Sequence, residues 1–510
     1  MGGAEPLPDD GDYSKMSFVG LFFMGFFWVC GGPYGGEGLI QLAPTGVIFS
    51  VYLASQFLYA MPIALINAEL AVAIPEDGGI VVWTQRAFGP IVGGHNSWWC
   101  YVSYCFDSTI YPLLAATYIL IALRIEPEDE RHRIIELGIA EGIVVSITLL
   151  KLLGNDVLLK FIEVATVVSL GPIVVFLVWG AATVRMRPER WAQWEFPDLG
   201  SSLSDAADGS IGSAGGGPAA GDIQWKLLIS WVIWLNSGFL AVGALAAGVA
   251  DPRRSFPLLV ATLVPFIFLV NASPFLISLC VDEDRSNYES GHFSVLAEEV
   301  AGVWLRHCLL VGAVTCTVAL YANCIIIPEI TMQFAVQEHF PSRSKIDGSV
   351  LDPSDKSVAW LWRHPDGAVA PAYVLFNGAL ASVLVLLPYR VLIEFAITTI
   401  AMPTLFFLGS FLVLRWREPE IQEKFRACPG GRGKLGFCLA VCLALPPAAL
   451  TVLQVGLALS DEGVDVDGTR GGGGDQGGAS IGGWKIPMPA LLAQLAVFAL
   501  GSIGHLIGWW

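Results

Sequence analysis

The stretch "VCGGPYGGEGLI", residues 29 to 40, interrupts an apolar run that begins near Phe18, and it brings glycines, a Pro and a Glu into the middle of that run. In hydrocarbon every backbone N–H and C=O group needs a partner, so unwound peptide is tolerated only where it is packed in protein or lines a wet cavity. The break therefore predicts that this segment crosses a membrane as two half-helices, with a site between them.

The rest of the composition agrees with a membrane environment. The 510 residues are 54% hydrophobic and only 14% charged, whereas soluble domains carry roughly 25% charged residues. A transmembrane helix needs about 20 mostly apolar residues. Segments that meet this requirement are centred near residues 28, 58, 108, 143, 170, 236, 268, 320, 380, 404, 446 and 498. We predict an all-α, multi-pass integral membrane protein with about 12 helices, for which the lipid bilayer is the surrounding phase.

Several function classes find no support in the sequence. The Cys residues lack metal-ligand spacing, and we find no HExxH motif, no Walker loop and no GxSxG motif with a plausible triad. We therefore expect neither an enzyme nor a metal or other cofactor. The short basic loop "DPRRSFP" argues against nucleic-acid binding by its size, and nothing in the sequence identifies a partner subunit.

The chain divides into a core and two flanking parts. We expect a cytoplasmic N-terminus over residues 1–16, a core of ten helices over 17–417, and two further helices over 418–510 separated by a Gly-rich external loop, 460–480. Loop charges favour cytoplasmic N- and C-termini, and the plasma membrane is the default location. The stretch "IPEDGGIVVWTQRAFGP", residues 74–90, is too short to span and predicts an amphipathic helix at the inner surface.

A second break follows five spans after the first. In "WVIWLNSGFLAVGALAAG", residues 231–248, Asn236, Ser237 and Gly238 interrupt the apolar run. Paired interruptions at matching positions of two five-span halves indicate an inverted-repeat transporter with its site between the broken helices. The alternative for each break alone is close helix packing through small residues.

Glu37 and Asp107 are the acids most suited to hold a ligand. Glu37 follows the first break, and an ionisable group at membrane depth is costly enough to suggest a function. Because a resident carboxylate competes with a substrate carboxylate, an amine-bearing substrate fits better; the alternative is that Glu37 only satisfies the helix end.

Asp107 shares one helical face with Cys100, Tyr104 and Tyr111. Charge pairing and aromatic faces together offset the desolvation of an ammonium group. The alternative for Asp107 is an internal pair with Lys, Arg or backbone. Trp234 and Phe239 flank the second break and either stack on an alkyl-ammonium chain or pack in the core.

Two further acids are candidates for carrying a coupled proton. Glu163 lies in "LLKFIEVATVV" and Glu394 in "YRVLIEFAITTI". The alternative for Glu163 is an ion pair with Lys160, three residues earlier.

Several motifs match a known family. "CGGPYGGEG" (30–38) resembles "SGGPFGVED", "INAELAVAIPEDGGIVVWT" (66–84) resembles "ITAEMGTMFPENGGYVVWV", "FDSTIYP" (106–112) is similar to "IDNALYP", and "AGVADPRRSFPLLV" (247–260) is similar to "GEVDNPKKTLPKAL". The second set belongs to plant and protozoan polyamine uptake permeases of the amino acid–polyamine–organocation superfamily. The likeness runs from about residue 17 to 417.

The resemblance implies a five-plus-five inverted repeat with broken helices one and six, and proton-driven uptake of a small organic cation such as putrescine or spermidine. The expected substrate-binding residues are Gly31, Gly32, Pro33, Tyr34, Gly35, Gly36, Glu37, Asp107, Tyr111, Trp234, Asn236, Ser237 and Phe239. Two positions depart from the family, because Leu240 and Gly248 stand where the relatives carry Asp and Glu. This leaves open a shorter diamine, or a cationic or neutral L-amino acid, as substrate. A membrane nutrient receptor that binds without transporting is a further alternative.

Overall fold

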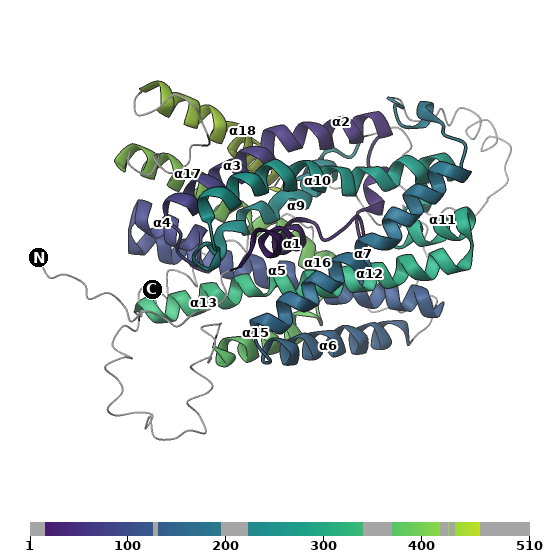
Figure 1. Ribbon diagram of the computed structural model, residues 1–510, viewed down its shortest axis with the longest axis horizontal. Helices are drawn as coiled ribbons and strands as arrows, with labels where there is room; N and C mark the ends of the chain where they lie inside the picture. The colour runs from purple at the N-terminus through teal and green to yellow at the C-terminus, as the bar shows by residue number, and fades with distance from the viewer. Residues whose placement is uncertain are drawn as a thin grey trace, which may run out of the picture.

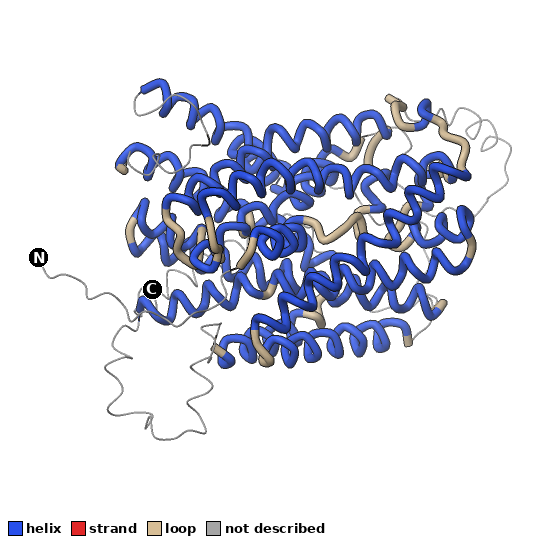
Figure 2. The backbone as a smooth tube through the Cα atoms, viewed as in Figure 1, coloured by secondary structure: helices blue, strands red, loops and turns tan. Residues whose placement is uncertain are grey.

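The computed structural model describes residues 16–125, 131–194, 223–339, 370–418, 427 and 434–459. Within these ranges the chain is helical, with two isolated bridges and no strand (Figure 2). Every expected span except the last, near residue 498, contains a helix, and the last lies outside the described residues. Eight helical segments of the described chain are long and apolar enough to cross a bilayer. The expectation of an all-α, multi-span protein is confirmed.

The helices follow one another with short connections. The first half contains α1 (Phe18–Val29), η1 (Glu37–Gln41), α2 (Thr45–Ser55), η2 (Gln56–Ala60), α3 (Met61–Ala73), α4 (Ile80–Phe88), α5 (Pro90–Leu123), α6 (His132–Lys151), α7 (Asn155–Thr183) and η3 (Pro188–Arg190). The second half contains α9 (Trp225–Ser237), η5 (Gly238–Leu240), η6 (Val242–Ala244), η7 (Ala246–Gly248), α10 (Pro252–Val281), η8 (Arg285–Asn287), α11 (His292–Ala301), α12 (Val303–Cys324), α13 (Ile326–His339), α15 (Pro371–Leu384), α16 (Tyr389–Thr399), α17 (Ala401–Arg417) and α18 (Lys434–Leu459).

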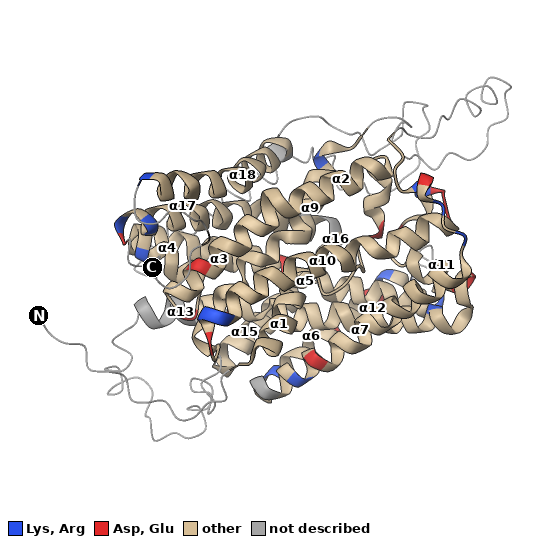
Figure 3. Ribbon diagram, turned by 45° about the horizontal axis from the view of Figure 1, so that its top comes forward, with Lys and Arg blue, Asp and Glu red and all other residues tan. Residues whose placement is uncertain are grey.

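The long helices run roughly along the longest axis of the molecule, so it has two ends (Figure 1). One carries α4 and is called the α4 end; the other carries α11 and is called the α11 end. Most charged positions lie towards these two ends (Figure 3). Helix α12 packs against α5 and α7, and α10 packs against α1 and α3. An apolar middle between two charged ends is the arrangement that a bilayer requires.

Helix α4 forms where the sequence predicts an amphipathic helix, but most of its side chains are buried in protein. Trp83 is fully buried, and Thr84 accepts a hydrogen bond from the Asn96 amide (2.9 Å) and contacts the Ser410 hydroxyl (3.2 Å). Only its polar edge is exposed, where Arg86 pairs with Glu418 (2.6 Å). The helix therefore packs between α5 and α17 instead of lying on the bilayer surface.

Candidate functional site

The first break is an irregular segment whose conformation requires glycine. Helix α1 ends at Val29, and η1 begins only at Glu37. Gly31 (φ 65°) and Gly35 (φ 79°) lie in the left-handed region, which glycine adopts without steric cost. The second half of this span is a five-residue 3₁₀-helix, shorter than the half-helix expected from the sequence. All the site residues expected in this segment are buried: Gly31, Gly32, Pro33, Tyr34, Gly35 and Gly36.

The unwound segment is held by hydrogen bonds from neighbouring helices. The Tyr118 hydroxyl of α5 accepts from the Gly35 N–H (2.7 Å), and the Tyr34 hydroxyl donates to the Ser169 carbonyl of α7 (3.0 Å). These bonds satisfy groups that lipid would leave unpaired. The break is therefore packed in protein, as the argument from the sequence requires.

The second break lies against the first. Helix α9 ends at Ser237, and the rest of the span is a series of 3₁₀ turns, η5 to η7. The Asn67 amide of α3 donates to the carbonyls of Phe239 (3.1 Å) and Leu240 (3.0 Å). A Cβ atom at Gly238 would overlap the carbonyl oxygen of Trp28 in α1. The two broken spans thus meet backbone to backbone, and glycine allows that approach.

Glu37 lies on the first turn of η1 and is only 1% exposed. Its carboxylate accepts hydrogen bonds from the Gly291 N–H (3.1 Å) and the Tyr118 hydroxyl (3.4 Å). No Lys or Arg pairs with it among the residues that the structure describes. Glu37 therefore links the first broken span to α5 and to the segment before α11.

Asp107 is the centre of a second polar cluster, between α5 and α9. Its carboxylate accepts from the Trp234 indole N–H (3.0 Å) and the Tyr111 hydroxyl (3.4 Å). The hydroxyl of the buried Tyr104 has no hydrogen-bond partner in the described chain. Asp107 and Trp234 are both partly exposed, and no basic side chain pairs with Asp107 within the described ranges. A carboxylate between aromatic side chains, without a cationic partner, suits an ammonium group.

The remaining residues expected near the second break make local contacts. The Asn236 amide donates to the Val232 carbonyl (2.8 Å), and its oxygen accepts from Gln56 of η2 (3.2 Å). The Ser237 hydroxyl donates to the Trp234 carbonyl (2.9 Å). Phe239 is 2% exposed and packs in the core. None of these three contacts the Asp107 carboxylate through a hydrogen bond among the described residues.

The two carboxylates are arranged along one face of α5. Asp107 and Tyr111 are one turn apart, and Tyr118, which holds Glu37, lies on the same face. Eleven residues of α-helix separate positions 107 and 118, which corresponds to a rise of roughly 16 Å. Asp107 and Glu37 are therefore two distinct acidic positions at different depths.

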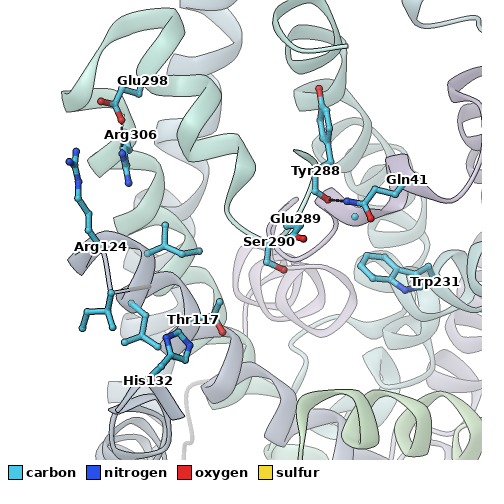
Figure 4. Close-up of a pocket in the computed structure, with 14 residues that line it drawn as sticks. Gln41, Thr117, Arg124, His132, Trp231, Tyr288, Glu289, Ser290, Glu298 and Arg306 are labelled. Carbon is cyan, nitrogen blue, oxygen red and sulfur yellow. Dashed lines mark hydrogen bonds and ion pairs between the residues drawn. The ribbon is translucent and has the colours of Figure 1, made fainter. Parts of the chain in front are cut away.

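A cavity of about 850 Å³ opens at the α11 end (Figure 4). Its lining includes Thr117 of α5, Trp231 of α9 and Glu289 before α11. The Trp231 ring contacts the Trp234 ring edge to face, with 6.2 Å between centroids, so the lining leads to the Asp107 cluster. At the α4 end the Met16 N–H donates to the Gly248 carbonyl (2.8 Å).

The cavity carries charges of both signs. Arg306 pairs with Glu298 of α11 (2.6 Å), and this hydrogen bond keeps the pKa of Glu298 below its usual value. Arg124 and Glu289 also line the cavity, and neither has an ion-pair partner among the described residues.

The two candidate proton carriers have different standings in the structure. Glu163 is exposed on the outer side of α7, and it forms no ion pair with Lys160 within the described chain. Glu394 is part of α16, but its side chain lies outside the described residues.

Two buried ion pairs escaped the reasoning from the sequence. Glu69 of α3 pairs with Arg415 of α17 (2.9 Å), both 1% exposed, and Lys151 of α6 pairs with Glu329 of α13 (2.5 Å). The apolar surroundings of Glu69 in "INAELAVA" were the available signal for one of them. Each partner lies far along the chain from the other, so no local spacing reveals the pair. Breaking a buried pair is costly, which makes both pairs structural ties between spans.

Comparison with known proteins agrees with this arrangement. A family model described as amino acid permease matches residues 17–460. A probable polyamine transporter of Arabidopsis thaliana is 22% identical over 463 residues, covering 87% of this chain and 82% of the relative. A polyamine transporter of Oryza sativa subsp. japonica is 24% identical over 462 residues (89% and 75%). A second probable polyamine transporter of Arabidopsis thaliana is 24% identical over 479 residues (90% and 87%).

Proposed function

The chain belongs to the amino acid permease family, and from this premise we propose that it imports polyamines such as putrescine and spermidine together with protons. It is a multi-pass membrane transporter and not an enzyme. The relatives named as polyamine transporters support a small organic cation as substrate. We place the protein in the plasma membrane with cytoplasmic termini, so that the α4 end faces the cytoplasm.

The observation that carries the substrate assignment is the Asp107 cluster. A partly exposed carboxylate accepts hydrogen bonds from Trp234 and Tyr111, and it has no basic partner among the described residues. An ammonium group gains charge pairing with the carboxylate and contact with the aromatic faces, and together these offset its desolvation.

An L-amino acid is the second candidate substrate, and Arg124 in the cavity is the observation that favours it. A bound amino acid also needs donors for its own carboxylate. Close to the first break, the Gly291 N–H and the Tyr118 hydroxyl already bond to Glu37. The polyamine assignment therefore fits the buried part of the site better.

Alternating access supplies the transport mechanism. The cavity opens at the α11 end, while at the α4 end Met16 bonds to Gly248 and the Gly78 N–H donates to the Ala244 carbonyl (2.8 Å). In the opposite state these α4-end contacts part and the cavity closes. The meeting of the broken spans at Gly238 and Trp28 is the point about which the spans move. Glu163 and Glu394 are the candidate carriers of the coupled proton.

Uptake into proteoliposomes tests the function. We expect labelled putrescine or spermidine to accumulate, and an inward proton gradient to raise the rate. Unlabelled polyamines should compete, whereas arginine and leucine should not. Competition by amino acids and not by polyamines would support an amino acid permease instead. Binding without flux in sealed vesicles would support a receptor.

Trp234→Phe is expected to raise the KM for the polyamine about tenfold, because it removes the indole donor to Asp107 and keeps an aromatic ring; a hydrogen bond to a charged group contributes roughly 1.5–3 kcal/mol. The measurement is the concentration dependence of uptake. Trp179→Phe, on the exposed side of α7, is the matched control and should leave the KM unchanged. An unchanged KM in Trp234→Phe would show that the indole N–H does not organise the site.

A further inference from the structure

The mouth of the cavity contains a carboxylate and an aromatic ring that the proposed function does not yet use. Glu289 and Trp231 both line the cavity, and they come from the α10–α11 connection and from α9 (Figure 4). Their elements meet at Gly38, where a Cβ would lie 3.6 Å from the Tyr288 carbonyl and 3.8 Å from the Trp231 ring. The Gln41 amide donates to the same Tyr288 carbonyl (3.1 Å). The backbone beside Glu289 is therefore held next to Trp231.

The chemistry of this mouth favours a cation. The Glu289 side chain is exposed, with no ion-pair partner among the described residues, whereas the neighbouring acid Glu298 is already paired with Arg306. A carboxylate beside an indole face attracts an ammonium group. In Figure 4 Arg124 lies on the other side of the cavity from Trp231.

This mouth is continuous with the Asp107 cluster. Trp231 contacts Trp234 (6.2 Å between centroids), and Trp234 donates to Asp107 (3.0 Å). Along α5, the cavity-lining Thr117 is ten residues beyond Asp107, a rise of roughly 15 Å. A ligand that touches both places must be elongated and must carry ammonium groups at separate positions.

We propose that Glu289 and Trp231 form an outer subsite for a second ammonium group, so that the transporter prefers triamines and longer polyamines over diamines. The inference rests on the proposed function. The inner ammonium pairs with Asp107, the alkyl chain passes along the two indole rings, and the outer ammonium pairs with Glu289. A diamine bound at Asp107 is too short to gain this second pairing.

Glu289→Gln tests the subsite in proteoliposomes containing the full-length protein. The KM for labelled spermidine should rise about fivefold, as expected for the loss of one partly solvated ion pair, while the KM for labelled putrescine should stay unchanged. The matched control is Glu299→Gln, an exposed acid of α11 that does not line the cavity. It should leave both KM values unchanged.

The two levels of the proposal fail in different ways. If the wild-type protein takes up neither polyamine, the proposed function is wrong. If the wild-type protein transports both and Glu289→Gln leaves the spermidine KM unchanged, or raises both KM values equally, the outer subsite is wrong. Unchanged putrescine uptake by the variant also shows that it folds. If Arg124→Gln raises the spermidine KM and Glu289→Gln does not, the mouth does not recognise a cation and the subsite is again overturned.

Discussion

Asp107→Asn or Glu37→Gln is expected to lower polyamine uptake at least about 100-fold at subsaturating substrate, because removing one partner of a desolvated ion pair costs roughly 3–5 kcal/mol. Both substitutions keep the size of the side chain and remove its charge. In Glu37→Gln the amide oxygen still accepts from the Gly291 N–H, so the fold around η1 has reason to persist. The measurement is the initial rate of labelled spermidine uptake by purified protein in proteoliposomes.

The control for this prediction is Glu189→Gln, which removes an exposed carboxylate of η3 outside both acidic positions. It should transport like the wild-type protein. Normal uptake by Asp107→Asn would remove the basis for an amine in the α5–α9 cluster. If Glu37→Gln alone transported normally, Glu37 would serve only the packing of the first break, and the inner ammonium would depend on Asp107.

Gly238→Ala is expected to destabilise the protein by about 3 kcal/mol or more and to abolish uptake, because the added Cβ overlaps the Trp28 carbonyl oxygen. The contact is with backbone, so no flexible side chain can move aside. The two broken spans must separate to make room, and the hydrogen bonds from Asn67 to the second break are then disturbed. Thermal unfolding of the purified protein in detergent should show a lower melting temperature.

Gly248→Ala is the matched control for this substitution. Gly248 lies at the end of the same broken span, and a Cβ there meets no atom within 4 Å. We expect the melting temperature and the uptake rate of this variant to equal those of the wild-type protein. A Gly238→Ala variant with unchanged melting temperature and uptake would mean that the spans do not meet at this point.

The sequence alone was sufficient for the spans and for both breaks. Lipid cannot pair with backbone polar groups, so a transmembrane segment must be a long apolar helix, and any interruption must be packed or hydrated. "CGGPYGG" and the Asn236–Gly238 stretch therefore stand out in a single chain. The cost of an acid at membrane depth marked Glu37 and Asp107 in the same way.

Only the tertiary structure decided which groups meet. Trp234 reaches Asp107 across 127 residues of sequence, and Gly291 reaches Glu37 across 254. The buried pair of Glu69 with Arg415 likewise joins α3 to α17. Periodicity and composition describe one segment and its solvent, whereas these contacts depend on how distant helices pack against one another. The sequence therefore identified the residues that need partners, and the packing of the helices selected the partners.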